Sequence, residues 1–140
     1  NGEQLSELGF LCNPGVPIPA VAARITGLTD EILKDEPAFD TFEGRVRSLI
    51  AEADEVVAHN LSYDKFVIDT ELSRIGKAAD WPAVQICTVE ETEWHQGYRL
   101  NLGALHEHLF GEPFSGAHRA KGDVDALTLC FLELRERGDL

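Results

Sequence analysis

Two aspartates and one histidine have positions that suit them for chemistry at a shared site. The first, Asp64, precedes Ile68, Leu72 and Ile75 by four, eight and eleven residues. On a helix this spacing puts the carboxylate in line with the apolar stripe that faces the core. A carboxylate in that position must be paired, hydrogen-bonded or bound to a metal ion, because an isolated buried charge is too costly.

The second aspartate, Asp123, repeats this arrangement on the last predicted helix. It precedes Leu127, Cys130 and Leu134 by four, seven and eleven residues. Two carboxylates at the core-facing N-terminal ends of different helices could converge on one cation. For either aspartate alone another interpretation stays open, because a first-turn aspartate stabilises the helix dipole by ~0.3–1 kcal/mol without any metal.

Each of these helices also carries an aspartate that is predicted to face solvent. Asp69 lines up with Lys65 and Ser73, and Asp125 falls beside Lys121. The helical stripe therefore separates one aspartate from its neighbour on each helix.

The histidine is His118, five residues before Asp123. In a continuous helix the two would point about 140° apart, at 3.6 residues per turn. On a loop before Gly122, however, the imidazole could swing over the cleft that Asp123 faces and reach a metal-bound water. Imidazole exchanges protons near neutral pH, so it suits a general base. A surface histidine without a function is the open alternative.

Strands and helices alternate along the chain and predict how these residues are positioned. We expect the 55–58 strand to end at His59 and Asn60, at the carboxyl end of the sheet where α/β domains place their sites. Strands are predicted at 5–12, 55–58 and 84–88, and helices from 42, at 62–75, 102–110 and 122–137. A helical turn is predicted at 30–34, after a short apolar stretch at 21–25 that Gly27 closes.

This order predicts one α/β domain over residues 1–140, with a mixed sheet flanked by helices. At 44% hydrophobic residues, the chain can bury one core. No apolar run approaches the ~20 residues that span a bilayer, so no membrane contact is expected. Three widely separated cysteines and no apolar signal segment predict a cytoplasmic setting.

The charge balance limits how the protein could hold nucleic acid. The chain has 12 basic and 25 acidic residues, a net charge of −13. This argues against broad phosphate neutralisation by a basic surface. Either the carboxylates form a solvated acidic surface, or some of them bind divalent cations that contact phosphate. Composition alone leaves both open.

Three segments, in order, resemble the DnaQ-like DEDDh exonucleases of the ribonuclease H-like superfamily. Residues 13–31 resemble the family's stretch between its third strand and first helices. Residues 58–64, Ala-His-Asn-Leu-Ser-Tyr-Asp, resemble its second motif, and residues 118–123, His-Arg-Ala-Lys-Gly-Asp, resemble its third. The resemblance implies a ribonuclease H-like exonuclease fold with the first strands missing from these residues.

The resemblance also implies an activity, 3′-to-5′ hydrolysis of terminal phosphodiesters of DNA or RNA with two Mg²⁺ or Mn²⁺ ions. Its implied partners are the 3′ end of a single-stranded nucleic acid and a polymerase or a second copy of the chain. The residues that it implies are the metal ligands Asp64 and Asp123, the general base His118, and the substrate-binding residues His59, Asn60, Tyr63 and Thr26.

The sequence departs from the family at its first motif, an Asp-x-Glu on the first strand. No such pair falls on a predicted strand here, so two of the four expected carboxylates are absent from these residues. We expect the first two strands to precede Asn1. Thr26 also stands where many members carry a histidine. The alternative function is a catalytically inactive exonuclease-like module that binds a protein partner or a nucleic-acid end.

Overall fold

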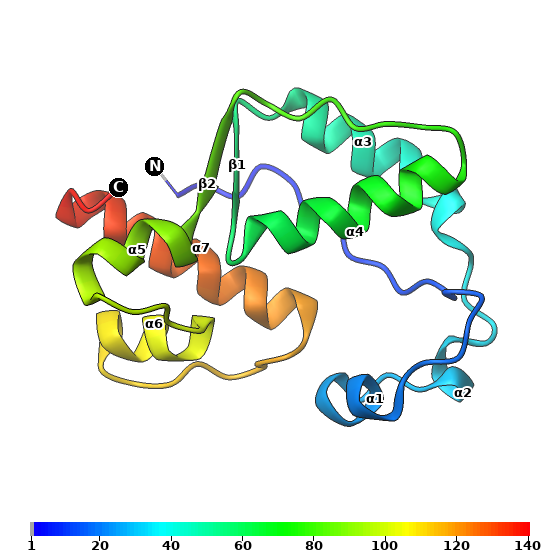
Figure 1. The fold of residues 1–140 in the computed structure, drawn as a ribbon, viewed down its shortest axis with the longest axis horizontal. Helices are drawn as coiled ribbons and strands as arrows, with labels where there is room; N and C mark the ends of the chain where they lie inside the picture. The colour runs from blue at the N-terminus through cyan, green and yellow to red at the C-terminus, as the bar shows by residue number, and fades with distance from the viewer. Residues whose placement is uncertain (1) are drawn as a thin grey trace.

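A pair of parallel strands lies at the centre of the fold (Figure 1). The structure is a computed structural model that describes residues 2–140, without the side chains of residues 94–96. In the described residues the sheet consists of β1 (Glu55–Ala58) and β2 (Val84–Cys87), in register from Glu55 opposite Val84 to Ala58 opposite Cys87. The antiparallel member of the expected mixed sheet is not among these two strands.

Helices pack on both sides of the strand pair, with α3 and α4 toward one end of the molecule and α5, α6 and α7 toward the other (Figure 1). The helices are α1 (Ala20–Thr26), α2 (Asp30–Leu33), α3 (Glu43–Glu52), α4 (Leu61–Arg74), α5 (Thr88–Gln96), α6 (Leu102–Phe110) and α7 (Ala120–Arg137), with a 3₁₀ turn η1 (Phe39–Thr41).

Local capping interactions explain where several helices begin and end. The Asn101 side chain accepts a hydrogen bond from the Ala104 N–H, which starts α6 as an N-cap should. Gly111 and Gly138 follow α6 and α7 in the left-handed conformation that glycine adopts without strain. These capping residues are local features of the sequence, and the predicted bounds of α6, 102–110, match the structure.

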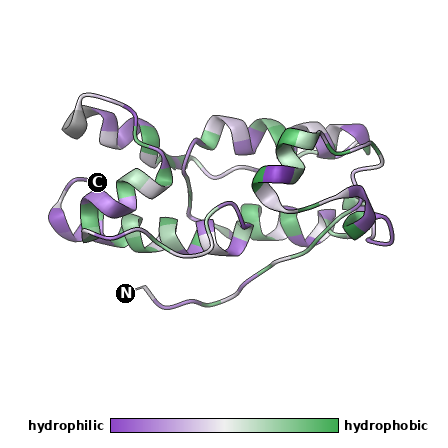
Figure 2. Cartoon of the chain, turned by 90° about the horizontal axis from the view of Figure 1, so that it is seen from below, coloured by the Kyte–Doolittle hydropathy of each residue, from purple (hydrophilic) through white to green (hydrophobic). Residues whose placement is uncertain are grey.

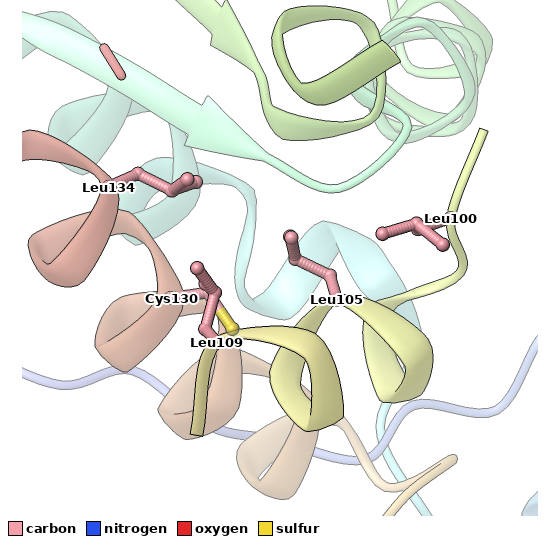
Figure 3. Packing of buried hydrophobic residues seen from close by; sticks show 5 residues of the cluster. All are labelled: Leu100, Leu105, Leu109, Cys130 and Leu134. Atoms are coloured by element: carbon pink, nitrogen blue, oxygen red, sulfur yellow. The ribbon is translucent and has the colours of Figure 1, made fainter. Parts of the chain in front are cut away.

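The largest buried cluster lies between α6 and the C-terminal half of α7 (Figure 3). In Figure 3 the side chains of α6 and α7 point toward one another below the strands. Leu105 and Cys130 keep 1% and 0% of their surface exposed, so this part of the core is tightly closed. The cluster consists of Leu100, Leu105, Leu109, Cys130 and Leu134.

The strand predicted at 5–12 is wrong, because this segment forms no strand. It runs extended past the helices instead (Figure 2). Leu5 is 88% exposed, while the Phe10 ring stacks on Phe42 with centroids 4.1 Å apart. A strand needs a neighbour to pair its backbone N–H and C=O groups. No described segment lies beside 5–12 in that way.

Two other predictions needed correction. No helix is predicted directly after the 84–88 strand, yet Thr88–Gln96 forms α5, whose buried side chains include Thr88, Val89 and Thr92. The last helix begins at Ala120 rather than at Gly122. None of the helices in the described part of the chain has the length and hydrophobicity of a membrane-spanning segment.

Candidate active site

A pocket of about 920 Å³ lies beside β1 and contains the residues that the sequence singled out for chemistry. Val56, Val57 and Ala58 of β1 form one wall. Further apolar side chains from α3, α4, α7 and the extended N-terminal segment complete a mainly apolar lining. Four ionisable side chains reach it, and they come from separate parts of the sequence: His59, Asp64, His118 and Asp123.

Asp64 lines the pocket from the first turn of α4. Asp64 is exposed, so the structure does not enclose it in the core as the helical stripe predicted. Partial burial of its carboxyl nevertheless raises the pKa above the ordinary value. Asp69, on the other face of the helix, accepts a hydrogen bond of 2.9 Å from the Trp81 indole. The helical stripe therefore distinguished the aspartate that lines the pocket from the one that does not.

Asp123 lines the same pocket from the first turn of α7. Its Oδ1 accepts a hydrogen bond of 3.1 Å from the backbone N–H of His118. Asp125 faces away and pairs with Lys121 at 3.3 Å. The loop that carries His118 thus fixes the carboxylate of Asp123. The spacing of residues along the helix does not predict this hydrogen bond.

The loop before α7 gives His118 an unusual backbone conformation. His118 has φ +65°, and Asn60 is the other non-glycine residue of the described chain in the left-handed region, at φ +78°. Residues other than glycine rarely adopt this conformation, so it marks positions where surrounding structure holds the backbone. Both residues lie at the ends of segments that contribute side chains to the pocket. His118 itself is exposed and lines the pocket, as expected of a loop residue.

His59 is held by the protein at both ring nitrogens. Nδ1 lies 2.9 Å from the Thr88 hydroxyl, and Nε2 lies 3.0 Å from the Leu100 carbonyl. A carbonyl oxygen only accepts, so Nε2 carries the proton and Nδ1 accepts from Thr88. Burial lowers the pKa of His59 and favours this neutral form. Thr88 was not anticipated as part of the site; its only sequence signal is a hydroxyl directly after an apolar strand.

The remaining predicted substrate residues lie near the pocket without lining it. Asn60 precedes α4, and Tyr63 in the first turn is 62% exposed. The Thr26 hydroxyl donates to the Ala22 carbonyl at 2.9 Å. The end of α1 lies next to the His118 loop, since a Cβ at the following residue, Gly27, would be 3.6 Å from the Arg119 guanidinium.

Carboxylate oxygens are the ligands that Mg²⁺ and Mn²⁺ prefer, so Asp64 and Asp123 fit such ions chemically. Within the part of the chain that the structure describes, however, no group of three or more His, Cys, Asp or Glu side chains is arranged to hold a metal ion. The two aspartates would contribute part of a coordination shell, and further ligands would come from water or from groups outside this pair.

Known proteins resemble this chain over almost its whole length. The profile of the RNase_T family, described as exonuclease, matches residues 1–131. A DNA polymerase III subunit epsilon-like protein of Rhodobacter capsulatus is 31% identical over 137 residues, covering 96% of this chain and 19% of that protein. The 3′-5′ exonuclease DinG of Bacillus subtilis is 27% identical over 143 residues, covering 98% of this chain and 15% of that protein. The chain spans about a fifth or less of these relatives.

A solved structure shows the same fold. Exonuclease X, in complex with 5′ overhanging duplex DNA, superimposes with a TM-score of 0.65 at 19% identity, covering 99% of this chain and 78% of that one. This likeness confirms the predicted fold class, an α/β ribonuclease H-like exonuclease fold. Because the family profile covers most of the residues, the chain belongs to the DnaQ-like exonuclease family.

Proposed function

We propose that this chain is the exonuclease domain of a nuclease that removes nucleotides from the 3′ end of a nucleic acid. Hydrolysis of the terminal phosphodiester would take place in the pocket beside β1. The observation that carries the proposal is the convergence of Asp64, Asp123 and His118 on this one pocket from α4, α7 and the loop before α7.

Divalent cations, Mg²⁺ or Mn²⁺, are the proposed cofactors, and Asp64 and Asp123 are their proposed ligands. When bound, two such ions supply the positive charge that activates water and stabilises the leaving oxygen. The raised pKa of Asp64 supports a cation at this position, because a nearby positive charge stabilises a carboxylate that is partly desolvated. Cations would also offset part of the net charge of −13, which otherwise repels a phosphate backbone.

His118 is the proposed general base that takes the proton from the attacking water. Its imidazole belongs to a loop residue that lines the pocket, while its own backbone N–H holds the Asp123 carboxylate. A base on this loop therefore stays at a fixed place relative to one proposed metal ligand, which general-base catalysis requires.

The proposed substrate contacts are His59, Asn60, Tyr63 and Thr26. Both ring nitrogens of His59 are engaged, so it would present its ring face to a nucleotide rather than a hydrogen bond. The exposed ring of Tyr63, beside Asp64, could stack on a base. Thr26 ends α1, which lies against the loop that carries His118.

The names of the relatives favour DNA as the substrate and a replicative polymerase as the setting. One relative is named as similar to the epsilon subunit of DNA polymerase III, and DinG is named a 3′-5′ exonuclease. We propose single-stranded DNA 3′ ends as the first substrate to test, with RNA as the comparison. Association with a polymerase or with a second copy, and the cytoplasmic setting, stay predictions.

The test is degradation of a 5′-labelled single strand by the full natural protein in the presence of Mg²⁺. We expect a ladder that shortens from the 3′ end, and loss of at least ~100-fold in rate for Asp123→Ala and for His118→Ala. Chelation with EDTA should stop the reaction, and Mn²⁺ should restore it.

Matched controls come from the same two helices. Asp125→Ala and Asp69→Ala remove carboxylates that pair with Lys121 and Trp81 and do not themselves line the pocket, so both variants should retain activity. Full activity in Asp123→Ala or His118→Ala would refute the proposed site. Binding of a 3′ end without hydrolysis by the wild-type protein would point instead to an inactive binding module.

A further inference from the structure

We propose that Gly122 is a positioning residue for His118, because the loop that carries the histidine packs directly on the glycine backbone. The inference rests on the proposed function, since it assigns Gly122 a part in placing the proposed base. Gly122 would touch neither substrate nor metal and would act only through its neighbours.

The contact between Gly122 and the loop leaves no room for a side chain. Gly122 lies in the first turns of α7, and a Cβ there would fall 2.3 Å from the Gly116 carbonyl oxygen, 2.8 Å from its carbon and 3.0 Å from its Cα. By contrast, a Cβ at Gly44 in α3 would meet nothing within 4 Å. Glycine weakens a helix relative to alanine, so its presence at 122 is explained by this contact rather than by the helix.

The turn that rests on Gly122 is the one that holds His118. Gly116 adopts φ +84°, and its carbonyl accepts a hydrogen bond of 3.2 Å from the Arg119 N–H. His118 lies inside this turn, and its own N–H donates to Asp123. The turn is therefore fixed at two points on α7, by the backbone contact at Gly122 and by the carboxylate of Asp123.

A side chain at 122 would have to displace this turn. Ordinary contacts between carbon and oxygen are roughly 3.3–3.6 Å, so the turn would move by on the order of 1 Å. Displacements of this size at a reacting group can lower a rate by about 100-fold. The proposed base would move, while the walls of the pocket formed by β1 and α4 would not.

The experiment is a double-mutant cycle in the full natural protein with labelled single-stranded DNA and Mg²⁺. We expect Gly122→Ala to lower kcat by roughly 10–100-fold with KM changed less than about 2-fold. In the His118→Ala background it should cost nothing further, because the group it positions is already gone. Losses that multiply in the double variant would overturn the proposal, as would an unchanged kcat.

Gly44→Ala is the matched control, a helical glycine with open space that should keep full activity and melt at the same or a higher temperature. If Gly122→Ala fails to fold, Gly116→Ala strains the same turn from the loop side and carries the same expected result.

A second readout is independent of nuclease activity. In the wild type, the NMR signal of the His118 amide proton should be shifted downfield by its hydrogen bond to the Asp123 carboxylate. We expect this shift to disappear in Gly122→Ala, and its persistence would overturn the positioning role. If the wild-type protein cleaves no nucleic acid, the proposed function fails, and the amide signal still decides the role of Gly122.

Discussion

The two ends of α7 lie in opposite environments. Toward its C-terminus, Cys130 and Leu134 are closed against α6 with 0% and 3% exposure. Toward its N-terminus, Asp123 and Leu127 line an open pocket, and Val124 is 59% exposed. One helix thus connects a packed core to the candidate active site.

This difference separates the residues that hold the fold from those proposed to do the chemistry. Side chains in the α6–α7 cluster are expected to act on stability alone, because they are buried and none of them lines the pocket. The pocket, by contrast, contains polar side chains and strained backbone, as the left-handed conformation of His118 illustrates. The same substitution should therefore lower the free energy of unfolding far more in the cluster than at the pocket.

The largest effect on stability is expected at Leu105, which is 1% exposed in the cluster between α6 and α7. Leu105→Ala should lower the free energy of unfolding by about 2–5 kcal/mol through lost contacts and a cavity. Leu127→Ala makes the same change at the pocket wall, where less contact is lost, and should cost under about 1.5 kcal/mol. Equal losses in urea denaturation would contradict the contrast between the regions.

His59 bridges the two regions, because it links the end of β1 to Thr88 and to Leu100 of the cluster. His59→Ala should lower the free energy of unfolding by about 1–3 kcal/mol, because it removes the hydrogen bonds to both partners.

The pH dependence of stability gives His59 a distinct signature. Its pKa is lowered in the fold, so the unfolded chain binds the proton more tightly. Stability is fully present above the ordinary value of 6.5 and is lost as pH falls through it toward the folded pKa. The slope of stability between about pH 5 and 7 should flatten in His59→Ala, and an unchanged slope would exclude this source.

A smaller effect is expected from the ion pair between Arg135 of α7 and Glu55 of β1, 2.6 Å apart. Both side chains keep contact with solvent, so the pair contributes little. Arg135→Ala should lower the free energy of unfolding by only roughly 0.2–1 kcal/mol, and by less in high salt. A larger loss that salt leaves unchanged would mean that the contact of the Arg135 guanidinium with the Phe131 ring matters more than the ion pair with Glu55.

The smallest effect has the opposite sign. Burial raises the pKa of Asp64, so the folded chain binds its proton more tightly and stability falls as pH rises above the ordinary value of 3.8. Asp64→Asn should therefore raise the melting temperature at neutral pH without metal, by roughly 1–2 °C given its partial exposure. Mg²⁺ should stabilise the wild type and not the variant, and a lower melting temperature for Asp64→Asn would contradict the pKa shift.

Local signals in the sequence were sufficient for most helices and for part of the site. The stripes through Leu72 and Cys130 separated Asp64 from Asp69 and Asp123 from Asp125, because helical spacing is a local property. The resemblance to the DnaQ-like exonucleases, carried by three segments in order, is confirmed by the family match. The roles of the individual residues stay predictions.

What escaped prediction depends on contacts between distant residues. The 5–12 segment has the composition of a strand, but strand formation depends on a partner that no local pattern supplies. α5 was missed because Thr88 and Thr92 occupy its buried face, and threonine is counted as polar in a search for apolar periodicity. The backbone contact between Gly116 and Gly122 likewise depends on how the loop folds back onto α7, which no local pattern shows.

The two buried cysteines offer a way to watch each region open separately. Cys130 belongs to the cluster between α6 and α7, and Cys87 belongs to a second cluster with Leu61 and Val89 beside the pocket. Burial raises the pKa of Cys130 to about 11, so its thiol reacts only after the surrounding helices separate. The labelling rate of Cys130 would therefore measure the free energy of local opening in the α6–α7 cluster, and that of Cys87 the corresponding free energy beside the pocket, in a single sample.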